Sequence, residues 1–118
     1  MSQTYDVVVI ARAAPRGPKP ACIEGWSTPK GEPALGGPCL NVGCIPSKAL
    51  LASSEAYEHA QHHLAAHGIS VSGVKIDVAR MQARKDAIVG KMTKGIEYLF
   101  KKNKVAWIKG FGKFVSCA

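Results

Sequence analysis

Hydrophobic positions along the chain follow two kinds of pattern, which together predict alternating strands and helices. Residues 5–10 (YDVVVI) form a nearly continuous run rich in β-branched side chains. Such a run is typical of a strand that is buried on both faces of a parallel sheet. Residues 21–26 (ACIEGW) and 105–108 (VAWI) are two further strand candidates. The pattern therefore predicts an α/β fold with parallel strands.

Two long helices are predicted between the second and third strands. The first runs from about Cys39 to His67 and ends at Gly68, a residue type favoured just past a helix C-terminus. Asp77 is a suitable N-cap for the second helix, whose apolar residues recur at helical spacing with lysines between them. These apolar residues are Val78, Met81, Ile88, Met92, Ile96 and Leu99. Residues 68–76, between the two helices, are strand or loop.

The segment between the first two strands, residues 11–20 (ARAAPRGPKP), does not fit a parallel sheet. Two buried parallel strands need a crossover of about a dozen residues or more, usually a helix. This segment contains Pro15, Pro18 and Pro20 and has no helical periodicity. We therefore expect an aberrant linker here, with the first crossover helix missing.

Length and composition limit the class of protein. A chain of 118 residues is one domain at most, and 47% hydrophobic with 20% charged residues is ordinary for a soluble globular protein. No apolar run approaches the ~20 residues of a membrane span, and the start MSQTYDVVVI lacks a basic leader. These features predict a cytoplasmic protein with no membrane partner. In a reducing cytosol, a close pair of cysteines is redox-active or metal-binding more often than structural.

The net charge of +8 admits two interpretations. Clustered lysines and arginines in the last third of the chain could form a nucleic-acid surface, which would make the chain a non-catalytic basic binding module. Alternatively, they form a solvated helix face. No zinc-finger or RNP motif accompanies the charge, so we predict no nucleic-acid partner.

Two of the four cysteines, Cys39 and Cys44, lie five positions apart. On an ideal helix their Cα atoms would be roughly 8–9 Å apart, beyond the ~7 Å limit for a disulfide. A bond between them requires a distorted backbone, which Gly43 makes easier and to which Pro46 contributes by removing a helical hydrogen bond. A helix N-terminus would also favour a thiolate. Spacing alone leaves a redox pair and two inert buried cysteines as alternatives.

Metal binding is the competing explanation for these side chains. No paired C-x-x-C spacing occurs among the other candidate ligands, which are Cys22, Cys117 and the histidines. His59, His63 and His67 recur at intervals of four and could bind a metal, but such a stripe is more often a solvated helix face. We predict no metal site.

The whole stretch 36–51, GGPCLNVGCIPSKALL, closely resembles the redox-active signature of the flavoprotein disulfide reductases, usually written GGTCxNxGCxPSK. Leu40, Ile45, Ser47 and residues 49–51 look most like the dihydrolipoyl dehydrogenase branch, with the glutathione or mercuric reductase type as the alternative. The first two predicted strands and residues 99–114 (LFKKNKVAWIKGFGKF) also resemble that family's FAD domain. The resemblance implies a partial Rossmann-like FAD-binding domain, with residues 1–118 an incomplete amino-terminal part of it.

The resemblance also implies roles for individual residues. Cys39 would be the interchange thiol, Cys44 the thiol against the flavin, and Lys48 a neighbour of the flavin ring. Glu24 would bond the adenosine ribose hydroxyls. The implied catalytic residues are Cys39 and Cys44. The implied cofactor-binding residues are Glu24, Gly36, Gly37, Pro38, Cys39, Lys48 and Gly112.

At the level of the whole enzyme, the resemblance implies oxidation of protein-bound dihydrolipoamide through the Cys39–Cys44 disulfide and FAD, with NAD⁺ as acceptor. The implied partners are lipoyl domains of 2-oxo-acid dehydrogenase complexes and a second subunit in a homodimer. The sequence departs from the family in residues 11–20, which lack GxGxxG, and at Pro38, where the family has Thr. The family's NAD and dimer-interface domains are also absent, so we expect little or no dehydrogenase activity from these residues alone.

Overall fold

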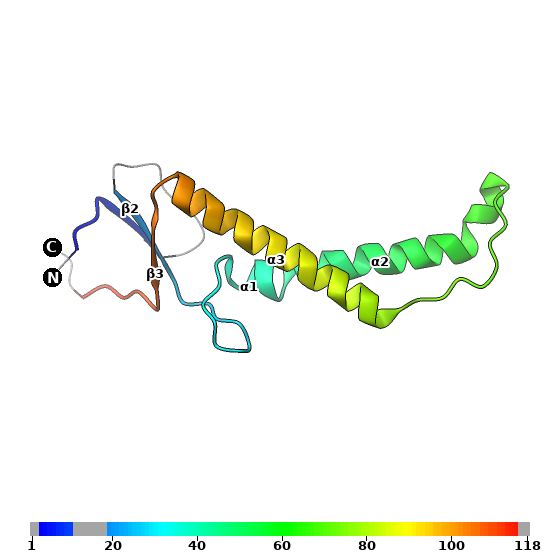
Figure 1. Cartoon of the computed structure of the whole chain (residues 1–118), viewed down its shortest axis with the longest axis horizontal. Coiled ribbons are helices and arrows are strands. Elements are labelled where there is room, and N and C mark those ends of the chain that lie inside the picture. Colours follow the sequence, from blue (N-terminus) through cyan, green and yellow to red (C-terminus); the bar gives the residue numbers. More distant parts are fainter. Residues whose placement is uncertain (1–2, 11–18, 116–118) are drawn as a thin grey trace.

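The computed structural model describes residues 3–10 and 19–115. The molecule is elongated, with principal extents of 68 × 28 × 24 Å. Figure 1 shows a small sheet at one end and a long helical hairpin that extends away from it. This shape separates a sheet region, where the first and last described residues lie, from a hairpin that is mostly exposed to solvent.

The sheet has three parallel strands in the order β1 (Val7–Ile10), β2 (Pro20–Glu24) and β3 (Ala106–Lys109). The central strand pairs on both sides, with Cys22 opposite Val9 of β1 and Trp107 of β3. The predicted α/β fold with parallel strands is confirmed, with bounds shifted by one or two residues. Because all three strands run the same way, their carboxyl ends meet at one edge of the sheet.

The first predicted helix is in fact interrupted. It consists of α1 (Gly37–Asn41), α2 (Cys44–His62) and the short 3₁₀ helix η1 (Leu64–His67), with a break between α1 and α2. Gly68 follows η1 in the left-handed conformation (φ 74°), as its type predicted. Residues 68–76 are loop.

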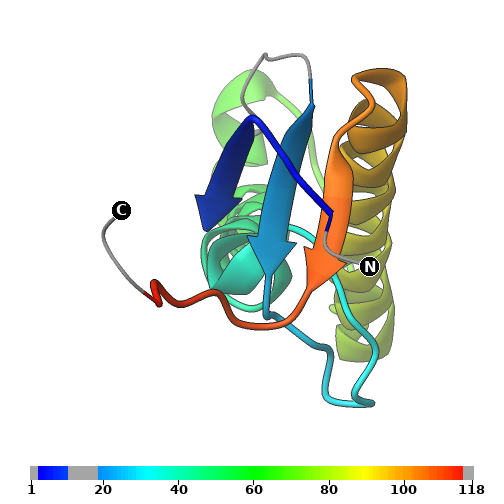
Figure 2. The same cartoon turned by 90° about the vertical axis from the view of Figure 1, so that its left-hand side faces the viewer.

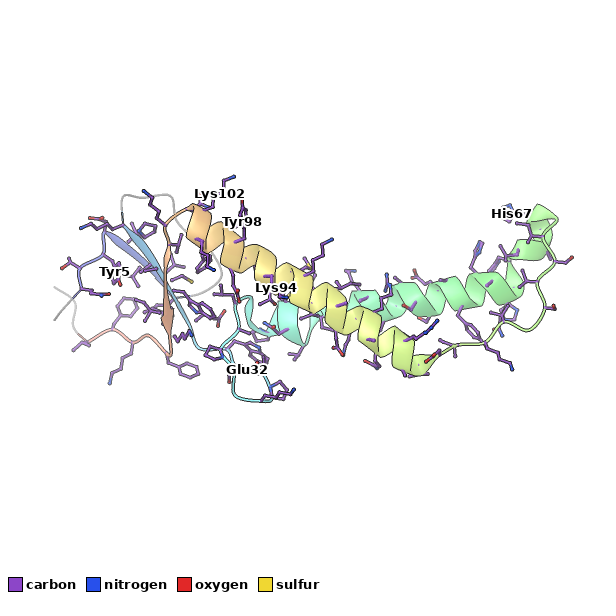
Figure 3. The ribbon with its side chains drawn as sticks, in the orientation of Figure 1. Tyr5, Glu32, His67, Lys94, Tyr98 and Lys102 are labelled. Atoms are coloured by element: carbon purple, nitrogen blue, oxygen red, sulfur yellow. The ribbon has the colours of Figure 1, made fainter. Side chains whose placement is uncertain are left out.

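The second predicted helix is α3 (Val78–Lys102), and its predicted cap is confirmed. The Asp77 carboxylate accepts a hydrogen bond from the backbone N–H of Arg80 at 3.0 Å. Lysines and polar residues cover its outer surface. Figure 3 shows Lys94, Tyr98 and Lys102 projecting from α3 into solvent.

The core lies where the C-terminal part of α3 meets the sheet. Cys22 of β2, Leu35 of the following loop, Phe100 of α3 and Val105 form one buried cluster. Ile96 and Trp107 pack against it. This small core fixes the end of α3 against β2 and β3, so it positions the loop that leads into α1.

The prediction that the first strand is buried on both faces is wrong. The side chains of Val7, Val8 and Ile10 are 39%, 47% and 46% exposed. β1 is an edge strand that pairs only with β2 in the sheet, whereas α3 runs behind β3 (Figure 2). Burial on both faces needs a covering layer on each, and β-branched composition alone does not supply one. The predicted missing crossover helix falls on residues 11–18, outside the described residues.

Within residues 3–10 and 19–115, no helix combines the length and the apolar character that a membrane crossing would require.

Candidate active site

The break between α1 and α2 brings the segment that carries the two cysteines back on itself. The carbonyl oxygen of Pro38 accepts two hydrogen bonds, from the N–H of Val42 at 2.9 Å and from that of Gly43 at 2.7 Å. The second bond joins residues five apart, one more than in an α-helix. A Cβ built on Gly43 would lie 3.3 Å from the Cα of Cys39. The backbone between Cys39 and Cys44 is therefore distorted from an ideal helix, which is the condition that a bond between the two residues would require.

Pro38 and Pro46 each lie in the first turn of a helix. α2 begins at Cys44, so Pro46 is its third residue, and Pro38 is the second residue of α1. The first backbone N–H groups of a helix have no intrahelical partner. The expectation that Pro46 removes a helical hydrogen bond is therefore wrong, because the helix restarts two residues before it. Each proline instead suits the start of a helix.

Cys44 is the first residue of the 19-residue helix α2, and its side chain is exposed. The positive end of the helix dipole stabilises negative charge within the first turn. Cys39 lies within α1 and is half-buried. The two sulfur-bearing residues thus occupy different environments, and the position of Cys44 favours its thiolate.

Asn41 holds the loop that precedes α1, a role that the sequence did not reveal. Its side-chain Nδ2 donates to the carbonyl oxygens of Leu35 at 3.2 Å and Gly37 at 2.9 Å. In this loop, Gly36 has φ 106° and Gly37 has φ 56°. Asn41 is part of the signature in residues 36–51, but its amide carries no redox chemistry, so only the fold shows its function.

Gly36 is required by its surroundings as well as by its backbone conformation. A Cβ at this position would lie 2.8 Å from the Cβ of Leu40, closer than real side chains approach. The positive φ is also a conformation that glycine adopts without a steric penalty. The glycine pair thus lets the chain turn from Leu35 of the core into α1.

Two cavities flank this loop. The first, of about 290 Å³, is almost wholly apolar and contacts both Cys39 and Gly36. Its other lining residues are Cys22, Glu24, Leu35, Leu40, Ile45, Met92, Ile96 and Phe100. The second, of about 330 Å³, lies at the carboxyl ends of the strands. It is lined by Ile10, Ile23, Glu24, Gly25, Trp26, Pro38, Gly110, Phe111 and Gly112. Glu24 lines both cavities.

Glu24 ends β2 and is fixed by two hydrogen bonds. Its side-chain Oε1 accepts from the backbone N–H of Trp26 at 3.0 Å, and its carbonyl oxygen accepts from Gly110 N–H at 3.1 Å. The second bond ties the turn after β3 to the end of β2. On that turn, a Cβ at Gly112 would lie 2.9 Å from Cδ1 of Ile10. A side chain at this position would therefore have to displace the end of the Ile10 side chain.

The structure gathers most, though not all, of the predicted site residues around these cavities. Glu24, Gly36, Pro38, Cys39 and Gly112 line one or both of them. Gly37 is buried at the start of α1. Cys44 and Lys48 are exposed on α2 and line neither cavity.

The histidine stripe lies at the far end of the hairpin, where Figure 3 labels His67. The ring of His59 is 5.7 Å from that of His63 and 6.3 Å from that of His67, centroid to centroid. Nε2 of His63 is 3.0 Å from Oε1 of Glu58. In the part of the chain that the structure describes, no group of three or more candidate ligands has a metal-binding arrangement.

Residues 6–117 match the family model described as pyridine nucleotide-disulphide oxidoreductase. The chain belongs to this family. The resemblance inferred from the cysteine signature is confirmed, and by family the chain is part of an oxidoreductase. The description refers to pyridine nucleotide and disulphide chemistry, and the family uses flavin and pyridine nucleotide in general.

Relatives with high identity cover nearly all of this chain. The dihydrolipoyl dehydrogenase of Cupriavidus necator is 61% identical over 98% of this chain and 27% of its own length. The mitochondrial dihydrolipoyl dehydrogenase of Pisum sativum is 57% identical over 98% of this chain and 24% of its own. A leghemoglobin reductase of Vigna unguiculata is 53% identical over the same share of this chain and 23% of its own. The chain thus spans about a quarter of the length of these relatives.

The comparison with the Cupriavidus necator enzyme also bears on the prediction that residues 11–20 are an aberrant linker. Its alignment runs over 127 positions, more than the 118 residues of this chain, so the relative has residues in the matched region that this chain lacks. A shortened connection such as residues 11–20 is consistent with that difference.

Proposed function

We propose that the chain is the amino-terminal FAD-binding and redox-disulfide segment of a dihydrolipoyl dehydrogenase. The observation that carries the proposal is the turn between Pro38 and Gly43, which folds the backbone between Cys39 and Cys44 back on itself beside the Glu24 cavities. The family match and the relatives named dihydrolipoyl dehydrogenase support it. In this proposal residues 1–118 form an incomplete FAD-binding domain.

The proposed chemistry is a thiol–disulfide exchange. One thiolate of a dihydrolipoyl group attacks Sγ of Cys39, the Cys39–Cys44 bond breaks, and Cys44 leaves as a thiolate. The second dihydrolipoyl thiol, after losing its proton, then displaces Cys39 and closes the lipoyl disulfide. Two electrons thereby pass to the cysteine pair. The helix N-terminus at Cys44 supports this direction, because it stabilises the leaving thiolate.

The described residues fit a dinucleotide at the strand ends. In open parallel sheets, ligands bind outside the carboxyl ends of the strands, where the 330 Å³ cavity lies here. Glu24 can accept hydrogen bonds from ribose hydroxyls through its carboxylate, and Gly112 admits close approach of a ligand. When bound, FAD would take the two electrons from the cysteine pair and pass them to NAD⁺. Lys48 is then proposed to lie against the flavin side of Cys44.

Several parts of the proposal concern the whole protein. NAD⁺ as acceptor, lipoyl domains of 2-oxo-acid dehydrogenase complexes as partners, a homodimer and a cytoplasmic location all belong to the full-length enzyme. Because residues 11–20 lack GxGxxG, the backbone cradle that holds a pyrophosphate at a helix N-terminus is missing from the sequence. We therefore expect this chain to bind FAD more weakly than a full-length relative does and to show little dehydrogenase activity.

A visible spectrum of the freshly purified chain, combined with thiol counts before and after mild reduction, tests the proposal. Flavin absorbance and a gain of two thiols on reduction are the expected results. Cys39→Ser and Cys44→Ser should each abolish that gain, whereas Cys117→Ser, outside the pair, should leave it intact. A colourless protein with four thiols both before and after reduction would overturn the proposal.

A further inference from the structure

The half of α3 next to the sheet carries a row of exposed side chains on one face of the helix. The row consists of Lys91, Lys94, Tyr98 and Lys102. Successive members are three or four positions apart, so they are neighbours on the helix surface. Figure 3 labels three of them along this half of α3. We call these four residues the Tyr98 row.

The core holds the Tyr98 row outward. Ile96 and Phe100 lie two positions on either side of Tyr98, which places each of them about 160° around the helix from it. Phe100 belongs to the buried core cluster, and Ile96 packs against that cluster. Because α3 cannot turn about its axis without exposing Phe100, the opposite face is presented to solvent in a fixed orientation.

Tyr98 is the apolar centre of the row. Its exposed fraction of 62% is larger than that of any other large hydrophobic side chain in the described helices. A single exposed apolar side chain is common on protein surfaces and by itself indicates no function. Here, however, the ring lies between Lys94 and Lys102, one helical turn away on each side. The row thus combines an aromatic ring that a partner could bury with cations that could pair around it.

The charge of this part of α3 is poorly balanced within the chain. Residues 91–104 contain five lysines and one acidic residue, Glu97. None of the ion pairs found among the described residues includes a lysine of the Tyr98 row. Like charges three or four positions apart destabilise a helix, and Lys91 and Lys94 are such a pair. An anionic partner would relieve that repulsion.

We propose that the Tyr98 row binds an acidic surface of another protein, with the Tyr98 ring buried at the centre and the lysines paired with carboxylates around it. Protein interfaces commonly have an aromatic anchor and a polar rim. Nucleic-acid sites favour arginine and several stacking rings, whereas the row has no arginine and one ring. None of the four residues lines either cavity of the candidate active site. The inference therefore goes beyond the proposed redox function and does not depend on it.

The test measures binding of the full chain to a random copolymer of glutamate and leucine, which offers both carboxylates and apolar side chains. The affinity should fall as the salt concentration rises, because exposed charges are screened. Lys94→Gln/Lys102→Gln should bind about fivefold more weakly, since two exposed ion pairs are lost. Lys30→Gln/Lys75→Gln removes the same charge from exposed positions outside the row and should bind as the wild type does.

Tyr98→Ala tests the central ring. It should weaken binding to the copolymer about tenfold and leave binding to poly-L-glutamate, which has no apolar side chains, nearly unchanged. Helix content by circular dichroism and the thiol count should match the wild type in every variant, because the replaced side chains are exposed. An unchanged copolymer affinity of Tyr98→Ala would overturn the burial of the ring.

Two further outcomes would overturn the proposal as a whole. Equal losses in the two double variants would show that net charge, rather than the Tyr98 row, attracts acidic polymers. The second outcome is tighter binding to duplex DNA, or to vesicles of phosphatidylcholine and phosphatidylserine, that is lost in Lys94→Gln/Lys102→Gln. It would assign the row to a nucleic acid or a membrane surface instead of a protein.

Discussion

The backbone N–H of Gly43 donates to the carbonyl oxygen of Pro38 at 2.7 Å and closes a turn one residue wider than an α-helical turn. The separation of these two residues equals that of Cys39 and Cys44, which follow each of them by one position. The wide turn therefore lies between the two cysteines: Cys39 is inside the segment that this hydrogen bond closes, and Cys44 follows it directly. Its stability should control the state of the cysteine pair.

Gly43→Ala should disrupt this turn. The added Cβ would lie 3.3 Å from both the Cα of Cys39 and the carbonyl oxygen of Pro38, and neither backbone atom moves freely. We expect a loss of about 1–3 kcal/mol in the free energy of unfolding, as for an overpacked site, and slower oxidation of the pair. Urea unfolding and thiol counts measure the two effects. Gly90→Ala in α3, where a Cβ meets nothing within 4 Å, is the control and should stabilise by about 0.5–1 kcal/mol.

Gly36→Ala tests whether the entry into α1 needs space as well as backbone freedom. The new Cβ would lie 2.8 Å from the Cβ of Leu40 at φ 106°, so strain and steric overlap add together. Gly31 also has a positive φ, of 80°, but a Cβ there would meet nothing within 4 Å. Gly31→Ala should therefore lower the free energy of unfolding only by the cost of the backbone conformation, about 1 kcal/mol. Gly36→Ala should lower the free energy of unfolding by at least about 1 kcal/mol more than Gly31→Ala does, because overpacking of a core destabilises by such amounts. Equal losses in urea unfolding would contradict the steric argument.

The sequence predicted the fold correctly where local residue patterns determine the structure. The β-branched run before Ile10 predicted β1, and the spacing of apolar residues after Asp77 predicted α3 together with its cap. Burial of β1 was not readable, because it depends on which layers cover the strand rather than on its own residues. The end of α1 at Asn41 was missed because the residues on either side of the break have no strong helix-breaking character except Gly43.

The candidate site divides in the same way. The signature around Cys39 identified the redox residues and the family, since those residue types carry the chemistry. The position of Glu24 in the lining of both cavities depends on how β2 meets the loop and the turn at Gly110, which no local pattern encodes.

Asn41→Ala should destabilise the loop that contains Gly36 and precedes α1. It removes the donor to the carbonyl oxygens of Leu35 and Gly37 and leaves them without that partner in a partly buried place. We expect a loss of about 1–3 kcal/mol in the free energy of unfolding. Asn103→Ala removes a single exposed bond to the Leu99 carbonyl and should cost less, about 0.5–1 kcal/mol. If the two variants unfold at the same urea concentration, Asn41 does not hold the loop.

Arg84 links the two long helices just beyond the redox segment. Its Nη1 donates to the carbonyl oxygen of Ala49 at 2.9 Å and to Oγ of Ser53 at 3.2 Å. Arg84→Ala should lower the free energy of unfolding by about 1 kcal/mol, because a charged donor is lost from a partly buried bond. Arg80→Ala is the matched control. That side chain is 91% exposed and 3.8 Å from Asp77, so its loss should change the urea midpoint little. Equal midpoints for both variants would show that Arg84 does not join the helices.

The exposed edge of β1 should make the chain self-associate. Val8 is 47% exposed on a strand whose outer edge is unpaired in the described sheet, and such edges pair with other chains. Val8→Lys places a charge on that edge and should raise the monomer fraction in light scattering at equal concentration. Ile69→Lys adds the same charge to a residue that is 50% exposed in the loop at the far end of the hairpin. The control should leave the association almost unchanged, since the hairpin loop presents no strand edge. If both variants reduce association equally, added net charge rather than the β1 edge controls it.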